Sequence, residues 1–323
     1  MRGLAAIALA AALAATVQAQ APAGGLPAVN AALQAGEADR AISLLAGLPA
    51  TEAGSAEAHN LRCRVYYALE QWDAAVGECE QAVRLDGQNS NFQLWLGRAL
   101  GEKADRASFI SAYSLAKRVR AAFEQAVAID PRNVDALSDL GEFYSSAPGV
   151  VGGGTDKAQG VVTKLEAVDM AQAHELRSRI ASANKDFATA EQEFHKAIAA
   201  SAHPAFQWMS LASFLRARGR WNDMAAAVAS GKAAVDKDRH AGVALFNGAT
   251  VLVQAGRNLD LAAKLLDAYL AGPVKTEEAP AFSAHVLRAR VAAKLGDTAR
   301  AKQERDAALA LASQYKPALD LKF

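Results

Sequence analysis

Small and larger apolar residues alternate along the chain at the spacing of one helix face, and the same pattern returns many times. A small residue is followed four positions later by a larger apolar one, and three positions after that by another small one. Ala75, Cys79 and Ala82 form one such set. Residues separated by three, four and seven positions lie on one face of an α-helix, so each set predicts an amphipathic helix. Further copies, some of them incomplete, contain Ala41, Phe123, Ala158, Ala190, Met224, Ala262 and Ala301.

The copies recur at nearly constant intervals. Ala41 and Ala75 are 34 positions apart, as are Ala190 and Met224, whereas Ala158 and Ala190 are 32 apart. A bundle of unrelated helices would show no fixed interval, and a repeat of this length is typical of stacked helix pairs. The sequence therefore predicts a helical repeat protein.

A second amphipathic segment precedes each copy, with a glycine or polar turn between the two. It carries Leu96-Gly97 in one repeat and Leu140-Gly141 followed by Tyr144 in another, and Pro131 ends one of the second helices. This arrangement resembles the tetratricopeptide repeat (TPR) family. The resemblance implies an all-α, right-handed superhelical solenoid of about eight helical hairpins over residues 20–323, with the first helices lining a concave face.

The small residues also predict how the helices pack. We expect Gly97, Gly141 and Ala212 of first helices to face small residues of second helices, so that the backbones approach closely. Each hairpin should contact only its neighbours along the array, because stacking alone buries the apolar stripes. Residues 313–323 should close the array before a loose tail that contains Pro317.

Two insertions interrupt the repeat, at about residues 102–118 and 146–155. The first, with the residues that follow it, is rich in Lys and Arg and is either a basic docking patch or an extended second helix with a solvated charged face. The second contains three successive glycines whose N–H groups could meet an anion, but it lacks the Gly-Lys-Ser/Thr of a phosphate-binding P-loop. A connector leading to a helix capped by Thr155 or Asp156 is the favoured interpretation.

The first 19 residues have the composition of a signal peptide. Arg2 precedes an apolar stretch from Leu4 to about Val17, and Val17-Gln18-Ala19 matches the small-x-small cleavage signal. The stretch is shorter than the roughly 20 apolar residues that cross a bilayer. We therefore expect an exported protein, periplasmic or secreted, without a stable membrane anchor after cleavage.

Charge and motifs narrow the function classes. The chain has 35 Lys and Arg against 34 Asp and Glu, and loss of Arg2 with the signal peptide makes it neutral. A nucleic-acid-binding protein would usually show a basic surplus. His174-Glu175 lacks the second histidine of a zincin motif, and the chain has no nucleophile elbow. The sequence thus predicts a protein that is not an enzyme, with no metal and no cofactor.

The two cysteines fall on the two helices of one predicted hairpin. Cys63 lies on the first helix and Cys79 on the second, each on the face turned toward the other helix. In an oxidising compartment they can form a disulfide, and the alternative is a pair of buried free thiols that act as small core residues.

The family resemblance implies which residues line the concave groove. They are the first-helix positions one after the Leu-Gly pair, four before that position and three after it. Arginine recurs there, and guanidinium groups can bind backbone carbonyls or carboxylates of an extended peptide. The matching residues are Asn60, Arg64, Tyr67, Arg98, Glu142, Arg179, Arg216 and Arg290.

These expectations favour a non-catalytic interaction scaffold of the periplasm or cell envelope, with a protein or peptide partner in the groove. The alternative is an enzyme or enzyme accessory with a small-ligand or phosphate site at the Gly149 to Gly154 loop.

Overall fold

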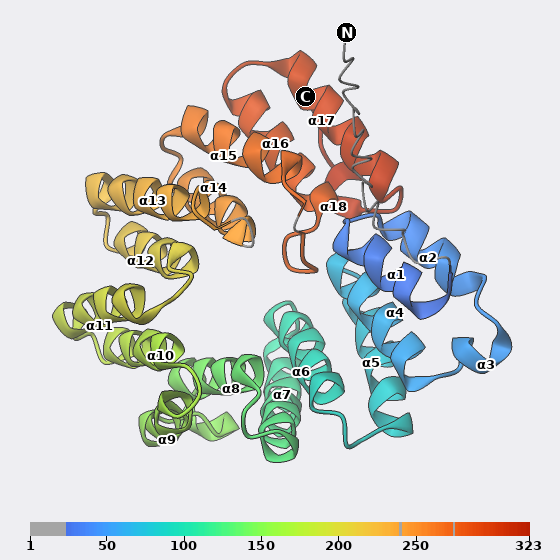
Figure 1. Ribbon diagram of the computed structural model, residues 1–323, viewed down its shortest axis with the longest axis horizontal. Helices are drawn as coiled ribbons and strands as arrows, with labels where there is room; N and C mark the ends of the chain where they lie inside the picture. The colour runs from blue at the N-terminus through green and yellow to red at the C-terminus, as the bar shows by residue number, and fades with distance from the viewer. Residues whose placement is uncertain (1–23, 239–240, 274) are drawn as a thin grey trace, which may run out of the picture.

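The computed structural model describes residues 24–238, 241–273 and 275–323, and within these ranges the chain is a solenoid of paired helices (Figure 1). The predicted all-α fold is confirmed, while the predicted signal peptide lies outside the described residues. The hairpins are α1/α2 (Gly25–Gln34, Ala38–Ala46), α4/α5 (Ala56–Ala68, Trp72–Leu85), α6/α7 (Ser90–Asp105, Phe109–Ile129), α8/α9 (Val134–Ser146, Thr155–Glu166), α10/α11 (Met170–Ala183, Phe187–Ala200), α12/α13 (Ala205–Ala217, Trp221–Val235), α14/α15 (Val243–Ala255, Leu259–Ala271) and α16/α17 (Ala281–Lys294, Thr298–Leu311). Three short elements complete the described chain: α3 (Ala50–Ala53), the 3-10 turn η1 (Gly149–Val151) and α18 (Lys316–Leu319).

Polar side chains mark where several first helices begin. Ser55, Asn89, Asn133 and Asp169 each accept a hydrogen bond from a backbone N–H in the first turn of α4, α6, α8 and α10. Such N-caps satisfy donors that have no partner within the helix and stabilise it by about 1 kcal/mol each. None of the described helices is long and apolar enough to span a bilayer.

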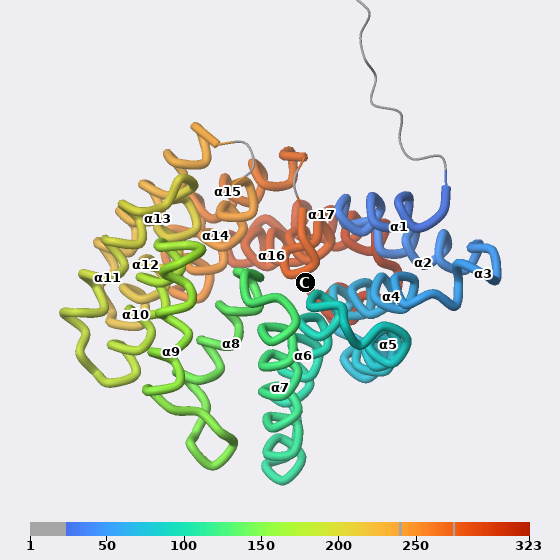
Figure 2. The backbone as a smooth tube through the Cα atoms, turned by 60° about the horizontal axis from the view of Figure 1, so that its bottom comes forward, coloured from blue at the N-terminus to red at the C-terminus, as the bar shows by residue number. Residues whose placement is uncertain are grey.

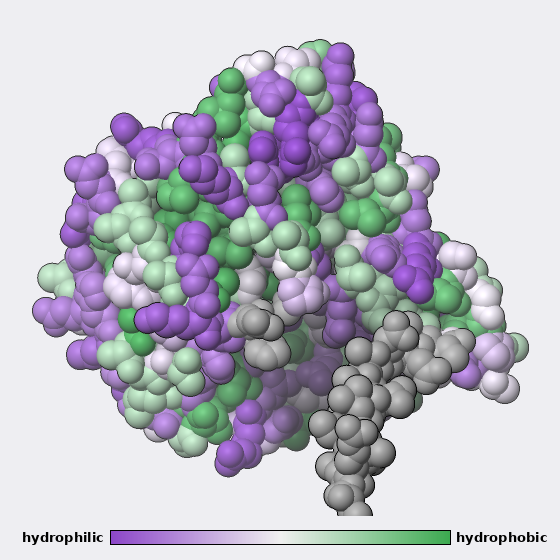
Figure 3. All heavy atoms as spheres, turned by 45° about the horizontal axis from the view of Figure 1, so that its top comes forward, coloured by the Kyte–Doolittle hydropathy of each residue, from purple (hydrophilic) through white to green (hydrophobic). Residues whose placement is uncertain are grey.

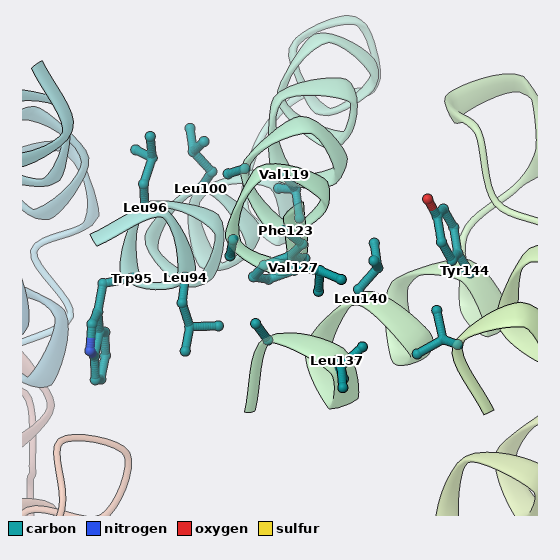
Figure 4. Close-up of a cluster of buried hydrophobic side chains, with 14 of the residues drawn as sticks. Leu94, Trp95, Leu96, Leu100, Val119, Phe123, Val127, Leu137, Leu140 and Tyr144 are labelled. Atoms are coloured by element: carbon teal, nitrogen blue, oxygen red, sulfur yellow. The ribbon is translucent and has the colours of Figure 1, made fainter. Parts of the chain in front are cut away.

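The glycines of the first helices receive large side chains from their neighbours, so the prediction that they face small residues was wrong. A Cβ atom at Gly97 would lie 2.3 Å from the ring of Phe123, and one at Gly141 would lie 2.4 Å from a methyl group of Leu176. Phe123 belongs to the second helix of the same hairpin, and Figure 4 shows it beside Leu94 and Leu137. Because the glycine has no side chain, a large side chain of the adjacent helix fills the space against its backbone. The packing is dense, but it does not depend on a close approach of two backbones.

The solenoid bends so far that its first and last repeats touch, which contradicts the prediction that hairpins contact only their neighbours. Figures 1 and 2 show α1 and α2 beside α16 to α18, so that the hairpins form a ring. At this seam, Gly36 has φ +74°, and a Cβ there would lie 2.5 Å from the backbone nitrogen of Ala281. One apolar cluster joins Leu33 and Leu61 to Phe282 and Tyr315 across the seam.

The end of the chain is part of this seam and is not the loose tail that was predicted. The ring of Tyr315 packs 4.7 Å from that of Phe282, centroid to centroid, and its hydroxyl donates a 2.7 Å hydrogen bond to Glu70. The side chain of Asp39 also accepts from the backbone N–H of Ser313 at 2.8 Å. Pro317 lies in α18, whose Ala318 is fully buried.

The two insertions are a long helix and a compact turn. The helix α7 includes most of the first insertion and projects beyond the other helices (Figure 2), with Phe109 and Ile110 exposed at its start. After η1 the chain turns directly into α9, whose cap is Gly154. The prediction of a side-chain cap from Thr155 or Asp156 was wrong, because the helix already begins at Thr155.

Candidate binding groove on the concave face

The first helices line the inside of the ring and the second helices its outside (Figure 1). On the inner face, Arg64 of α4 and Arg98 of α6 lie where the family resemblance placed groove arginines, one repeat apart. The loop between α15 and α16 crosses the ring to reach them, and Figure 1 shows it projecting toward the centre. The two arginines are therefore already bound, by residues of the same chain.

Two consecutive glutamates of this loop make the contacts. Arg64 donates from Nε to Oε1 of Glu277 at 2.8 Å and also bonds the same oxygen through its terminal nitrogen. Arg98 donates to Glu278 at 3.1 Å and to Asp139 of α8 at 2.7 Å. The Glu277 side chain is only 8% exposed, so this ion pair is largely removed from water.

An aromatic side chain lies between the two arginines. Their guanidinium carbons lie 5.4 Å (Arg64) and 5.1 Å (Arg98) from the ring centroid of Trp95, close enough for cation–π attraction. Tyr67 packs edge-on against Trp95 at 5.4 Å. In Figure 4, Trp95 points away from Leu96 and Leu100, which lie on another side of α6. We call Arg64, Trp95 and Arg98 with their surroundings the occupied half of the groove.

Burial changes the acidity of the groups around Arg98. It raises the pKa of Asp139 and of Glu278, against the opposing attraction of the Arg98 guanidinium. Burial also acts to lower the pKa of Arg98, but the charges of Asp139 and Glu278 and the hydrogen bond with Asp139 leave it above its ordinary value. The arginine thus stays charged, and the carboxylates around it keep their charge less readily than exposed ones.

The base of the loop is fixed by separate contacts. The hydroxyl of Tyr269 donates to the carbonyl of Ala279, and the buried ammonium of Lys275 donates to the carbonyls of Tyr269 and Gly272. Burial lowers the pKa of Lys275. These bonds hold the two ends of the loop against α15, while the glutamates at its tip lie against α4 and α6.

On the concave face of α8, α10, α12 and α14 the groove contains a cavity of about 850 Å³, which we call the open half. Its walls combine aromatic and apolar side chains with hydroxyl and amide groups, the mixture found in ligand sites. The main lining residues are Phe206, Phe214, Phe246 and Met209, with Ser145, Ser182, Ser210, Ser213, Asn247, Thr250 and Gln254.

The charged residues of the open half differ in their partners. Arg179 pairs with Glu142 and with Glu175, and Ser210 donates to Glu175 at 2.6 Å. Arg216 has no ion pair within the described part of the chain, and its Nε is buried without a hydrogen-bond partner there. A guanidinium in this state can bind an incoming carbonyl or carboxylate without breaking an existing contact.

The remaining predicted groove residues lie elsewhere or are covered. Asn60 is 3% exposed, with a buried Nδ2 that lacks a partner among the described residues, and it borders the occupied half. Tyr67 is half-buried beneath Trp95. Arg290 borders a separate cavity of about 650 Å³ beside Glu70 and Lys316, because α18 lies over this part of α16. The structure thus brings Arg64 and Arg98 together, and Arg179 with Arg216, but sets Arg290 apart.

Cys63 and Cys79 form a disulfide that ties α4 to α5, with Cα atoms 5.2 Å apart. The free-thiol alternative therefore does not describe the structure. A histidine on the same first helix makes a second link, since Nδ1 of His59 lies 2.6 Å from Oε2 of Glu78 on α5.

The same link occurs in two further hairpins and was not among the predicted features. Nδ1 of His174 lies 2.7 Å from Glu193, and Nδ1 of His285 lies 2.6 Å from Glu304. Each glutamate follows its histidine by 19 positions, and each histidine begins a His-x-Leu-Arg-x-Arg motif, in residues 59–64, 174–179 and 285–290. This motif was visible in the sequence, but a search for metal ligands within single helices does not reveal it.

The N–H groups of the three successive glycines in the glycine-rich loop already have hydrogen-bond partners. The N–H groups of Val151, Gly152, Gly153 and Gly154 all donate to carbonyls of residues 144–149. The carbonyl of Gly152 in turn accepts from Lys157 at 2.9 Å. A phosphate site built on the three successive glycines would require breaking those bonds.

Most of the basic residues near the first insertion are paired with acids. Lys103 pairs with Asp73, Arg106 with Glu102, and Arg118 with Glu80. Their charge is therefore offset locally, as expected of a solvated helix face. Over the face drawn in Figure 3, hydrophilic and hydrophobic side chains are interspersed.

No family model and no curated protein matches the sequence. Among solved structures, yeast Tom70 is similar, with a TM-score of 0.51 and 15% identity over 83% of this chain and 56% of that chain. A thermophilic TPR protein of Thermus thermophilus gives 0.47 and 16% over 56% of this chain and 91% of that one. PilW, a type IV pilus biogenesis factor, gives 0.39 and 15% over 82% and 96%. At these identities only the fold is informative, and by its fold this chain is a TPR-like helical repeat protein.

Proposed function

We propose that the protein is a non-catalytic interaction scaffold that holds a protein or peptide partner in the open half of its concave groove. The observation that carries the proposal is the cavity of about 850 Å³, in which the aromatic side chains of Phe206, Phe214 and Phe246 lie with Arg216, whose Nε has no hydrogen-bond partner among the described residues. Apolar side chains of an extended segment would fill the floor, and Arg216 would bind a carbonyl or carboxylate.

We further propose that the protein is exported and acts in the periplasm or outside the cell, with residues 1–19 removed. The disulfide supports this location, because such bonds persist in oxidising compartments. Determining the N-terminal residue of the protein from fractionated cells tests the location, and Gln20 is the expected first residue. An N-terminus at Met1 in the cytoplasmic fraction would contradict export.

The binding proposal is tested by affinity capture from the native cell envelope. Wild-type protein and a Ser213→Trp variant, in which a large side chain fills the cavity, serve as bait. Ser43→Trp on the exposed face of α2 is the matched control. We expect one defined partner with wild type and the control, and at least a tenfold lower recovery with Ser213→Trp. Equal recovery by all three baits would exclude the open half as the binding site.

Charge reversal at Arg64 or Arg98 is unsuitable for this experiment. It would place like charges against the buried Glu277 or against Asp139 and Glu278, and would destabilise the fold along with any binding.

A further inference from the structure

The tip of the α15–α16 loop, residues 276–278, lies in the occupied half of the groove as a bound ligand would. Glu277 and Glu278 reach Arg64 and Arg98 from 213 and 180 positions away in the chain. They bring two consecutive carboxylates to two arginines that flank one tryptophan. The contact is therefore the same kind of recognition that groove arginines offer to an acidic peptide, made within one molecule.

We propose that Thr276-Glu277-Glu278 is an internal ligand of the occupied half, and that an acidic segment of a partner binds Arg64 and Arg98 by displacing it. This inference rests on the proposed scaffold function, because it adds a second, regulated contact for the same partner. Binding along the whole groove would then depend on a pair of acidic residues in the partner.

The distribution of contacts makes the tip separable from the rest of the loop. Its base is held by Tyr269 and Lys275, whose partners are carbonyls of residues 269, 272 and 279. The hydrogen bonds that join the tip to Arg64 and Arg98 are made by the two glutamate side chains. The tip can therefore leave Arg64 and Arg98 while α15, α16 and the loop base keep their bonds.

An internal ligand weakens binding of an external one because only the molecules in which the tip is displaced can bind it. The apparent dissociation constant is the intrinsic constant divided by the fraction of molecules in which the tip is displaced. If the tip is displaced in fewer than about one molecule in ten, removing its carboxylates should tighten binding at least about tenfold.

A fluorescein-labelled, C-terminally amidated hexaglutamate peptide is a suitable probe, with hexaglutamine as the control peptide. Fluorescence anisotropy would compare wild type with Glu277→Gln/Glu278→Gln, which keeps the loop, and with Thr276→Gly/Glu277→Gly/Glu278→Gly, which removes the tip side chains. Circular dichroism and thermal melting would establish that each variant is folded. Having two variants keeps the test decisive if one of them fails to fold.

We expect at least tenfold tighter binding of hexaglutamate to a folded loop variant than to wild type. Adding Arg64→Gln and Arg98→Gln should abolish that gain, and hexaglutamine should show none. Equal affinity of wild type and a folded loop variant would overturn the inference, as would a gain that survives loss of both arginines. The affinity capture with the Ser213→Trp variant is a separate experiment. A failure of the internal-ligand proposal can therefore be distinguished from a failure of the scaffold proposal.

Discussion

The two halves of the groove differ in whether their arginines are engaged by other residues of the chain. Arg64 and Arg98 sit at the position that follows the glycine or small residue of their first helices, and both are engaged by the acidic loop. Arg216, on the concave face of α12, borders a cavity and has no ion pair within the described chain. A groove arginine is thus available or engaged according to what a distant segment brings to it.

The difference between the halves comes from closure of the ring. The loop that reaches Arg64 precedes α16, and α16 packs against the first repeat through Phe282 and the close approach of Ala281 to Gly36. In an open superhelix this loop would point toward solvent. Closure brings it against α4 and α6, while α8 to α14 remain uncovered on the inside.

Replacing Arg64 should therefore destabilise the fold far more than replacing Arg216. Arg64→Ala leaves the carboxylate of Glu277 buried without its partner and should lower the free energy of unfolding by about 3–5 kcal/mol. Arg216→Ala removes no ion pair and should change it by less than about 0.5 kcal/mol. Urea unfolding followed by circular dichroism measures both.

A second contrast concerns covalent support. The α4/α5 hairpin of the occupied half is tied by a disulfide, whereas the α10/α11 hairpin of the open half has Ser178 at the position of Cys63. A cross-link that closes a loop of this length, 16 positions, stabilises by about 3 kcal/mol. Cys63→Ser/Cys79→Ser should lose about that amount in urea unfolding. An unchanged midpoint under oxidising conditions would show that the bond adds no stability.

The histidine–glutamate links of the two halves differ in burial, and we expect a smaller difference in their contributions to stability. Glu193 is 9% exposed and Glu78 is 26% exposed, so Glu193→Gln should cost about 1–2 kcal/mol and Glu78→Gln less. Denaturation of the two variants at pH 7 tests the order. Equal losses would show that burial does not set the strength of these links.

Acid should weaken the link in the open half. Burial alone would raise the pKa of Glu193, but hydrogen bonds from Lys196 and His174 outweigh it and leave the pKa below its ordinary value. The folded state therefore favours the ionised carboxylate, and this contribution to stability is present above about pH 4.5 and is lost as the pH falls below it. In urea unfolding between pH 5 and 3, Glu193→Gln should lose less stability than wild type does. A parallel loss in both proteins would contradict this assignment.

Much of the fold could be predicted because it depends on local periodicity. Sets such as Ala75, Cys79 and Ala82 face one side of a helix, and their fixed interval implies stacked hairpins. The placement of the two cysteines on facing helices was also predicted, although the sequence left a disulfide and two free thiols as alternatives. These features depend on residues that lie within one repeat of each other.

The remaining features depend on contacts between distant residues. Small differences in the angle between successive hairpins accumulate around the array. The sequence of a single repeat therefore does not predict that residue 36 contacts residue 281. The engagement of Arg64 by Glu277 follows from that closure. Packing of Gly97 against Phe123 was also missed, because a small residue can accommodate either a backbone or a large side chain.

A double-mutant cycle between Arg64 and Glu277 tests the central claim most directly. Urea unfolding of wild type, Arg64→Ala, Glu277→Ala and the double variant yields the energetic coupling of two residues 213 positions apart. The closed ring with its internal ligand predicts a coupling of at least about 1.5 kcal/mol. Losses that add to within about 0.5 kcal/mol would contradict it, because residues that do not touch behave independently.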